Sequence, residues 1–292
     1  MNAPIVTLTT DWGDSDHYAA MVKGRLCSSI PDVRIVDLSH SQNWNSIAVA
    51  SKLIQYGCMS FPAGTVHIID FCEDLQMIAK AKKPYRPVPL LAECRGQFFL
   101  CCNRKLLEVS LDAECDSLVS LPLSADTPSD TFVAWSLFCD VAAKLVNGVP
   151  PSELGVSAAP LMRREFLRAQ FDGTIVSSRP DSIDHYGNVT LNLKYSDFVK
   201  YRAGRRFRME LEFQAGSLKA DIDLEDAVLK GSVMKCPTVT EVMLHYSEVR
   251  QGGLALTVSG TGYMQLAINQ GSVASLMGVN YATVCRFIFS DF

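Results

Sequence analysis

This sequence has no long apolar run, no excess of basic residues and no low-complexity stretch. No segment approaches the roughly 18 consecutive apolar residues of a membrane-spanning helix, so we expect no membrane partner. The first four residues carry no basic side chain and the apolar run 5–8 is short, which excludes a signal peptide and predicts a cytoplasmic protein. The net charge of −4 leaves no basic surface for phosphate groups, which argues against nucleic acid as the main partner.

Cysteine pairs with metal-binding spacing are also absent. The ten cysteines include no Cys-x-x-Cys pair, so we expect no structural zinc site and no bound metal. Seven of them lie in apolar or strand-like segments, where a free thiol behaves as a small hydrophobic side chain: Cys27, Cys58, Cys94, Cys101, Cys102, Cys139 and Cys285. In the cytoplasm these thiols are expected to be reduced.

The composition is that of a globular protein with more than one core. Hydrophobic residues make up 48% and charged residues 20% of the chain, which excludes disorder and a coiled coil. A length of 292 residues exceeds what one compact core usually takes. We therefore predict two domains, residues 1–160 and 161–292, with a linker that runs from Pro150-Pro151 to about Phe166.

The first half alternates between strand and helix patterns. Short β-rich apolar segments at 5–9, 33–38 and 65–69 predict buried parallel strands. Between them lie two amphipathic helices, the first with the apolar face Tyr18, Met21, Val22 and Leu26, and the expected caps are Ser15 or Asp16, then Asn45 or Ser46. This βαβαβ order predicts a doubly wound, mostly parallel α/β domain that binds ligands at the carboxyl ends of its strands.

Later segments predict further strands and one long helix. Segments 88–92, 97–102 and 106–111 resemble a meander around Arg95-Gly96. A helix is expected from Ser129 or Asp130 to Leu145, ended by Gly148 at C′. The second half contains seven closely spaced strand candidates, which predict a smaller all-β, barrel-like domain: 171–177, 189–193, 206–213, 242–247, 253–258, 263–268 and 283–289.

Two polar clusters follow predicted strands. Asp11 ends the first strand before Gly13, where a carboxylate can accept hydrogen bonds from a ribose diol. Asp14 and Asp16 can also be explained as acidic residues at a helix N-terminus. If Asp11, Asp14 and Asp16 together bind a metal ion, the protein could be a metal-dependent nucleoside hydrolase, which is the third hypothesis. Within 183–192, the Tyr186 ring can stack on a purine and the Asn188 amide can pair with its edge. The alternative is a tight turn, which Asp, Gly and Asn residues favour.

A third cluster, residues 263–274, is expected to form a strand followed by a capped helix. Its backbone could pair with a base, and a plain strand-to-helix corner explains it equally well. The three clusters together resemble the family of S-adenosylmethionine hydroxide adenosyltransferases and the related fluorinases and chlorinases. The matching motifs are Thr9-Thr10-Asp11-Trp12-Gly13, Met21-Val22-Lys23-Gly24, Ile35-Val36-Asp37-Leu38-Ser39-His40, Gly64-Thr65-Val66-His67, Asp184-His185-Tyr186-Gly187-Asn188 and Ile268-Asn269-Gln270-Gly271-Ser272.

That resemblance implies displacement of methionine from the ribose 5′ carbon of S-adenosylmethionine, with no cofactor. It also implies a homotrimer whose ligand lies between one subunit's N-terminal domain and its neighbour's C-terminal domain. The residues it assigns to the ligand are Asp11 for the ribose, Tyr186 and Asn188 for the adenine, Asp184 and Asn269 for the pocket, and Trp44, beside the position of a pocket tryptophan.

The residues that activate water in this family are mostly replaced here. Thr131-Phe132 is followed by Val133 where the resemblance implies a histidine, and the adjoining arginine and acid are absent. The family's catalytic aspartate is represented by Asp70, which stands earlier in its loop. Because an ordinary carboxylate titrates near about 4, we expect weak hydrolysis or none. Substitute groups could be Glu73, Asp74, Lys80 or Ser136, and the alternative function is a non-catalytic module that binds or senses an adenosyl ligand.

Overall fold

The structure is a computed structural model of the 292-residue chain. It describes residues 3–41, 47–71, 88–111, 115–123, 132–162, 168–213 and 238–290. The chain forms two compact units, Met1–Arg164 and Glu165–Phe292, here called unit 1 and unit 2. Across these described ranges, no helix is both long and apolar enough to cross a membrane.

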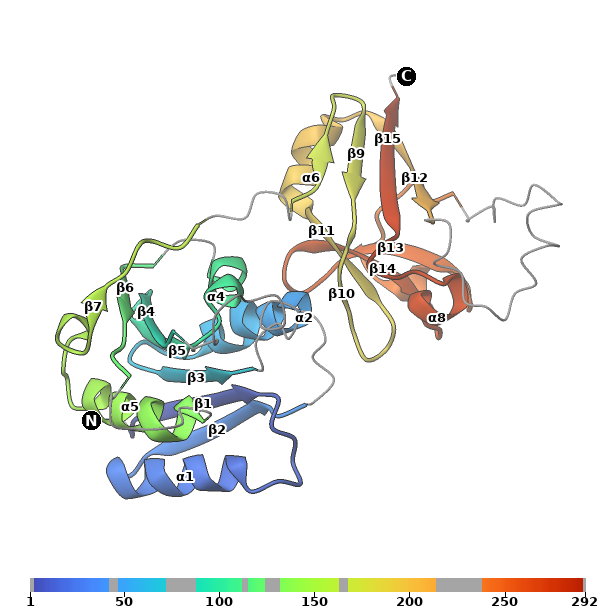
Figure 1. The fold of residues 1–292 in the computed structure, drawn as a ribbon. Coiled ribbons are helices and arrows are strands. Elements are labelled where there is room, and N and C mark those ends of the chain that lie inside the picture. Colours follow the sequence, from blue (N-terminus) through green and yellow to red (C-terminus); the bar gives the residue numbers. More distant parts are fainter. Residues whose placement is uncertain are drawn as a thin grey trace, which may run out of the picture. The chain divides into compact units, whose positions relative to one another are not determined.

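Unit 1 is built on a seven-stranded sheet with the order β2-β1-β3-β5-β4-β6-β7 (Figure 1). The first four strands of that order run parallel, whereas the remaining three pair antiparallel with their neighbours. The strands are β1 (Ile5–Thr10), β2 (Arg34–Ser39), β3 (Val66–Asp70), β4 (Leu90–Cys94), β5 (Gln97–Cys101), β6 (Ser117–Ser120) and β7 (Val156–Ser157). The expected doubly wound, mostly parallel α/β sheet is confirmed.

Helices cover both faces of this sheet. One face packs against α1 (Tyr18–Ser29), the π-helix η3 (Ala134–Phe138) and α5 (Cys139–Val146). The other packs against α2 (Ile47–Lys52), the π-helix η1 (Leu53–Gly57), the 3₁₀-helix η2 (Cys58–Ser60) and α4 (Arg104–Ser110). Because side chains alternate along a strand, Val6 and Leu8 of β1 join the α1–α5 core, while Thr7 and Thr9 contact His67 and Cys58 on the other side.

Two local predictions in unit 1 are wrong. Segment 106–111, expected as a strand, lies in helix α4, because the Asn103 side chain accepts from Leu106 N and caps the helix. A short apolar run fits a strand or a helix, so the cap decides.

Neither Ser15 nor Asp16 caps α1: its N-cap is His17, which makes no side-chain capping bond. Of the expected apolar face of α1, Val22 and Leu26 are buried, while Tyr18 and Met21 are exposed.

The end of unit 1 also differs from expectation. The long helix is present within the described residues as η3 followed by α5, and Gly148 has the positive φ of 84° expected at C′. Its predicted caps, Ser129 and Asp130, lie outside the described residues. The expected linker, from Pro150-Pro151 to about Phe166, contains the 3₁₀-helix η4 (Pro151–Glu153) and β7, and because β7 pairs with β6, residues 156–157 belong to the sheet.

One expected free thiol is a disulfide partner. Cys94, at the end of β4, is bonded to Cys115, and the two Cα atoms lie 4.3 Å apart. The pairing follows from the β4–β6 register, in which Glu93 lies opposite Ser117. Cys115 therefore reaches Cys94 across the sheet, which the sequence spacing of 21 residues does not suggest.

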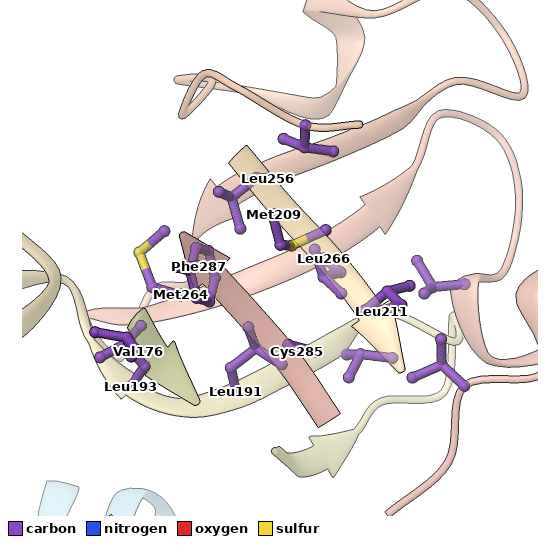
Figure 2. Packing of buried hydrophobic residues seen from close by; sticks show 14 of the residues in the cluster. Val176, Leu191, Leu193, Met209, Leu211, Leu256, Met264, Leu266, Cys285 and Phe287 are labelled. Atoms are coloured by element: carbon purple, nitrogen blue, oxygen red, sulfur yellow. The ribbon is translucent and has the colours of Figure 1, made fainter. Parts of the chain in front are cut away.

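Unit 2 contains two four-stranded antiparallel sheets, β10-β11-β14-β13 and β12-β15-β9-β8. Their strands are β8 (Gln170–Phe171), β9 (Ile175–Ser178), β10 (Pro180–Ile183), β11 (Val189–Lys194), β12 (Arg206–Glu212), β13 (Leu254–Val258), β14 (Tyr263–Ile268) and β15 (Val284–Ser290). Alternate residues of both sheets fill one core, and in β12 these are Phe207, Met209 and Leu211. Figure 2 shows Met209 and Leu211 in this core. The expected β domain is confirmed, with α6 (Tyr195–Arg202) and α8 (Val273–Met277) added.

One predicted strand of unit 2 is wrong. Segment 242–247 ends in the 3₁₀-helix η6 (Tyr246–Glu248), which a capping box between His245 and Glu248 starts. Segment 171–177 is interrupted because Asp172 Oδ1 accepts from the backbone N–H groups of Thr174 and Ile175. The strand-to-helix corner at 263–274 is confirmed, since the Ser272 side chain accepts from Ser275 N at the start of α8.

Candidate functional site

The winding of unit 1 changes direction between β1 and β3. The chain passes from β1 through α1 to β2 on one side of β1, then through α2 on the opposite face to β3 on the other side. Such a switch point opens a crevice at the carboxyl ends of the strands. Asp11 follows Thr10, the last residue of β1, and Thr10 lies opposite Asp70, the last residue of β3. The structure therefore brings two predicted site residues to the switch point.

The Asp70 carboxyl has a raised pKa. Its side chain alternates with Val66 and Ile68 and so stands on the α1–α5 face. Burial is the main reason that its pKa rises from 3.8 to about 6, while the bond from Trp12 lowers it and the charge of Asp11 raises it. The expectation that Asp70 titrates as an ordinary carboxylate is wrong, because the sequence does not show how far the end of β3 is buried.

Trp12 joins Asp70 to a cluster of rings. Its Nε1 donates to Asp70 Oδ2 over 3.1 Å. The indole stacks on His40 with a centroid distance of 5.9 Å and an interplanar angle of 14°, and it meets Phe132 edge-on at 5.1 Å. His40 Nδ1 lies 2.6 Å from Thr10 Oγ1, and His40 Nε2 lies 3.2 Å from Asp37 Oδ1. Residues from β1, β2, β3 and the start of η3 thus meet at one edge.

A cleft of about 620 Å³ opens beside this cluster. Its lining comes from the turn after β1 and the end of β2: Gly13, Asp14, Ser15, Asp37, Leu38, Ser39, His40 and Ser41. Hydroxyl and carboxylate groups dominate this lining, and such groups pair with the hydroxyl or ammonium groups of a small polar ligand.

In unit 2, the Asp184–Asn188 segment is a tight turn. Asp184 Oδ1 accepts from the N–H groups of Tyr186 and Asn188, and Asp184 Oδ2 accepts from Asn188 Nδ2, each over 2.9 Å. Gly187 has a φ of 80°, and a Cβ there would overlap the Ser272 side chain. Asp184 therefore shapes the turn, and Tyr186 projects from it with 75% of its surface exposed.

Asn269 follows β14, the strand that pairs with β11 after this turn. Its Nδ2 donates to Val249 O over 2.8 Å, and its backbone pairs with Gly252 and Gly253. Ala274 N, in α8, donates to Gly187 O over 3.2 Å, which holds the turn against the start of that helix. The two C-terminal motifs are thus in contact, and Tyr186 is exposed to a ligand, whereas the Asn188 amide is engaged by Asp184 and the Asn269 amide by Val249.

Several candidates lie elsewhere. Trp44, Glu73, Asp74 and Lys80 fall outside the described residues. Ser136 lies half-buried in η3, which packs against β3. Trp12 and His40 were not predicted as site residues, although both stand in the quoted motifs. An indole and an imidazole next to strand ends were the signal that could have found them.

The described ranges contain no group of three His, Cys, Asp or Glu side chains arranged to hold a metal ion. Asp11, Asp14 and Asp16, the donors considered for a metal-dependent nucleoside hydrolase, form no such group. This hypothesis is not favoured.

Comparison with known proteins extends the match to both units. Residues 6–155 match the SAM hydroxide adenosyltransferase N-terminal domain, and residues 181–286 match the C-terminal domain of the same family. An (R)-S-adenosyl-L-methionine hydrolase from Salinispora tropica is 25% identical over 285 residues, covering 94% of each chain. A fluorinase from Actinoplanes sp. is 22% identical, covering 93% of each chain.

The fold is shared with solved structures as well. An uncharacterized conserved protein from Thermotoga maritima superposes with a TM-score of 0.71 at 18% identity, covering 97% of this chain and 99% of that one. The two family domains together span most of the 292 residues in the order that the resemblance predicts. The chain belongs to the SAM hydroxide adenosyltransferase family.

Proposed function

We propose that this protein binds S-adenosylmethionine at the carboxyl edge of the unit 1 sheet and cleaves it slowly to adenosine and methionine. The observation that carries the proposal is the pair Asp11 and Asp70 at the switch point of a chain whose two halves both match this family. Asp11 accepts hydrogen bonds from the ribose hydroxyls. Asp70 takes the proton of a water molecule whose oxygen attacks the 5′ carbon, and sulfur leaves with the bonding electrons as the thioether of methionine.

The sulfonium is already an activated leaving group, so the reaction chiefly requires alignment of the attacking water. With its pKa raised to about 6, Asp70 is a better base near neutral pH than an ordinary carboxylate. The histidine and arginine that the resemblance implies beside it are nevertheless absent. We therefore expect slower turnover than in relatives that carry the full charged cluster.

Binding without reaction is the second candidate function. Val133, at the position of the family's histidine, is only 4% exposed and belongs to the α1–α5 core. An apolar side chain packed there adds no proton donor or acceptor. The same pocket would then serve to sense or sequester an adenosyl compound.

The proposal includes the adenine end and the assembly. Tyr186 stacks on the adenine and Asn188 pairs with its edge, with Trp44 and Asn269 completing the pocket. A homotrimer places Tyr186, Asn188 and Asn269 of one subunit beside Asp11 and Asp70 of its neighbour. We further propose a cytoplasmic location, with neither nucleic acid nor membrane as partner; there the Cys94–Cys115 disulfide is exposed to reduction.

Calorimetry with S-adenosylmethionine, adenosine and S-adenosylhomocysteine tests the binding step. Asp11→Asn should weaken binding by about 1–3 kcal/mol, because a charged acceptor of the ribose hydroxyls is lost. Asp16→Asn is the matched control, since Asp16 is an exposed acid on the same turn and does not line the cleft. Equal affinity of the Asp11 variant and the wild type, or no binding by the wild type, would contradict the proposal.

A discontinuous assay for adenosine over hours tests the chemical step. Asp70→Ala should abolish adenosine formation while the ligand still binds, and Ser136→Ala should retain it. Bound ligand with no adenosine from the wild type would select the sensing function instead.

A further inference from the structure

Within the described residues, Asp70 forms no ion pair with a cationic side chain. Among the described residues, Asp11 after β1 acts on this carboxylate by its charge, His40 stacks on Trp12 with Asp37 behind it, and Cys102 follows β5. Cys102 is included because Cys101 lies opposite Ile69. Phe132, just before η3, contacts Trp12, and the described residues 132–138 include no charged side chain. The recorded side-chain donor to Asp70 is the neutral indole of Trp12.

That indole is held in place from two directions. His40 stacks on it and Phe132 meets it edge-on, so the ring has little freedom to turn. His40 is only 7% exposed, and its own orientation is set by Thr10 on β1 and Asp37 on β2. Asp37 in turn accepts from Lys23 of α1. An indole nitrogen can only donate, so a ring held in this way always presents its N–H to Asp70.

We propose that Trp12 is the positioning residue of Asp70, fixing one carboxylate oxygen by its N–H so that the ionised carboxylate keeps the orientation required for proton transfer. This rests on the proposed role of Asp70 as the base. A hydrogen bond to a carboxylate favours the ionised form, which offsets the burial and the nearby Asp11. The neutral Trp12 N–H thereby provides part of the stabilisation of the ionised carboxylate that a cationic side chain would otherwise provide.

The first test uses the wild-type protein without ligand. The chain has three tryptophans, so the indole ¹H–¹⁵N resonance of Trp12 can be assigned by its loss in Trp12→Phe. It should show a pH-dependent shift with a step that Asp70→Asn abolishes. A Trp12 resonance that does not follow the titration of Asp70 would overturn the proposal, whether or not an adenosyl ligand binds.

The second test removes the donor and keeps the ring. In Trp12→Phe, the ¹³C titration of the Asp70 carboxyl should move to higher pH by about half to one unit, as expected for the loss of one hydrogen bond. The acidic limb of the pH–rate profile should move with it, and kcat should fall while KM stays the same. Trp135→Phe is the control, because Trp135 is 38% exposed and its ring contacts Arg25.

A merely structural role would lower the stability of Trp12→Phe and leave the titration of Asp70 unchanged, which would refute the proposal. If this variant does not fold, the wild-type resonance still decides. If the wild type makes no adenosine, the proposed reaction is wrong. The pH titrations of the Trp12 indole and of the Asp70 carboxyl then still show whether Trp12 is hydrogen-bonded to Asp70.

Discussion

Among single residues, His67 is a buried base that the proposed reaction does not use. It is fully buried in β3, where Nε2 donates to Gln97 Oε1 over 3.2 Å and Nδ1 accepts from Thr7 Oγ1 over 2.7 Å. Its ring stacks on Phe99 at 4.7 Å. Burial lowers the pKa of His67 from 6.5 to about 4, because the imidazolium would lose its hydration. The neutral ring therefore links β1, β3 and β5.

We expect this histidine to make the protein less stable in acid. In the unfolded chain His67 binds a proton below pH 6.5, whereas in the folded chain it does so only near pH 4. The contribution of neutral His67 to the free energy of unfolding is therefore fully present above pH 6.5 and is lost as the pH falls toward 4. Its loss should reach about 3 kcal/mol near pH 4. Denaturant unfolding of wild type and His67→Gln between pH 7.5 and pH 4.5 would measure this contribution.

The difference in free energy of unfolding between the two proteins should shrink as the pH falls, since glutamine keeps a polar contact and cannot be protonated. Asp70 acts in the opposite direction, because its raised pKa favours the folded state at low pH. That effect is common to both proteins and cancels in the comparison. Parallel pH profiles would contradict the assignment to His67.

Among the elements, the antiparallel half of the unit 1 sheet is closed by covalent and polar bonds at one end. The Cys94–Cys115 disulfide joins the end of β4 to the residue before Asp116, which leads into β6. Asp116 N donates to Glu93 O over 2.7 Å, and Arg95 N donates to Asp116 Oδ2 over 3.2 Å. Together these bonds hold β6 beside the β4–β5 hairpin.

Reduction of this disulfide should destabilise unit 1. Closing a loop of this length restricts the unfolded chain by about 3 kcal/mol. Dithiothreitol should therefore lower the unfolding midpoint of the wild type and have no effect on Cys94→Ala/Cys115→Ala. Cys27→Ser, which changes an exposed free thiol, should respond to the reductant as the wild type does. A thiol titration that finds Cys94 and Cys115 free without reductant would refute the expectation.

For the whole molecule, unit 2 presents exposed apolar side chains around the Asp184–Asn188 turn. Tyr186 is 75% exposed and Leu276 of α8 is 65% exposed. The contact of Gly187 with α8 brings their two segments together. Grouped apolar side chains at a surface are typical of an interaction site, and the proposed trimer would bury them at the ligand pocket.

Light scattering at micromolar concentration should give three times the mass of one chain. Leu276→Asp should shift the protein toward monomers, because it places a charge in the proposed contact. Val199→Asp is the control: Val199 is 49% exposed on α6 and lies outside this surface. A monomeric wild type, or a trimeric Leu276→Asp variant as stable as the wild type, would contradict this assembly.

The sequence by itself determined most of the strands, the tight turn at 184–188 and the order of the motifs. The apolar run of β1, the C′ glycine of α5 and the Ser272 cap of α8 depend on neighbours within a few residues. Such local chemistry can be read along the chain. Where local signals were balanced, capping side chains decided against a strand: Asn103 at 106–111, and His245 with Glu248 at 242–247.

Only the tertiary structure decided which distant residues meet and how they titrate. Trp12 and Asp70 are 58 positions apart, and the pairing of β1 with β3 brings them within one hydrogen bond. Cys94 finds Cys115 because β4 and β6 are neighbours in the sheet, although β5 and α4 lie between them in sequence. The raised pKa of Asp70 depends on burial by several elements, a property that the packed chain has and its linear order does not.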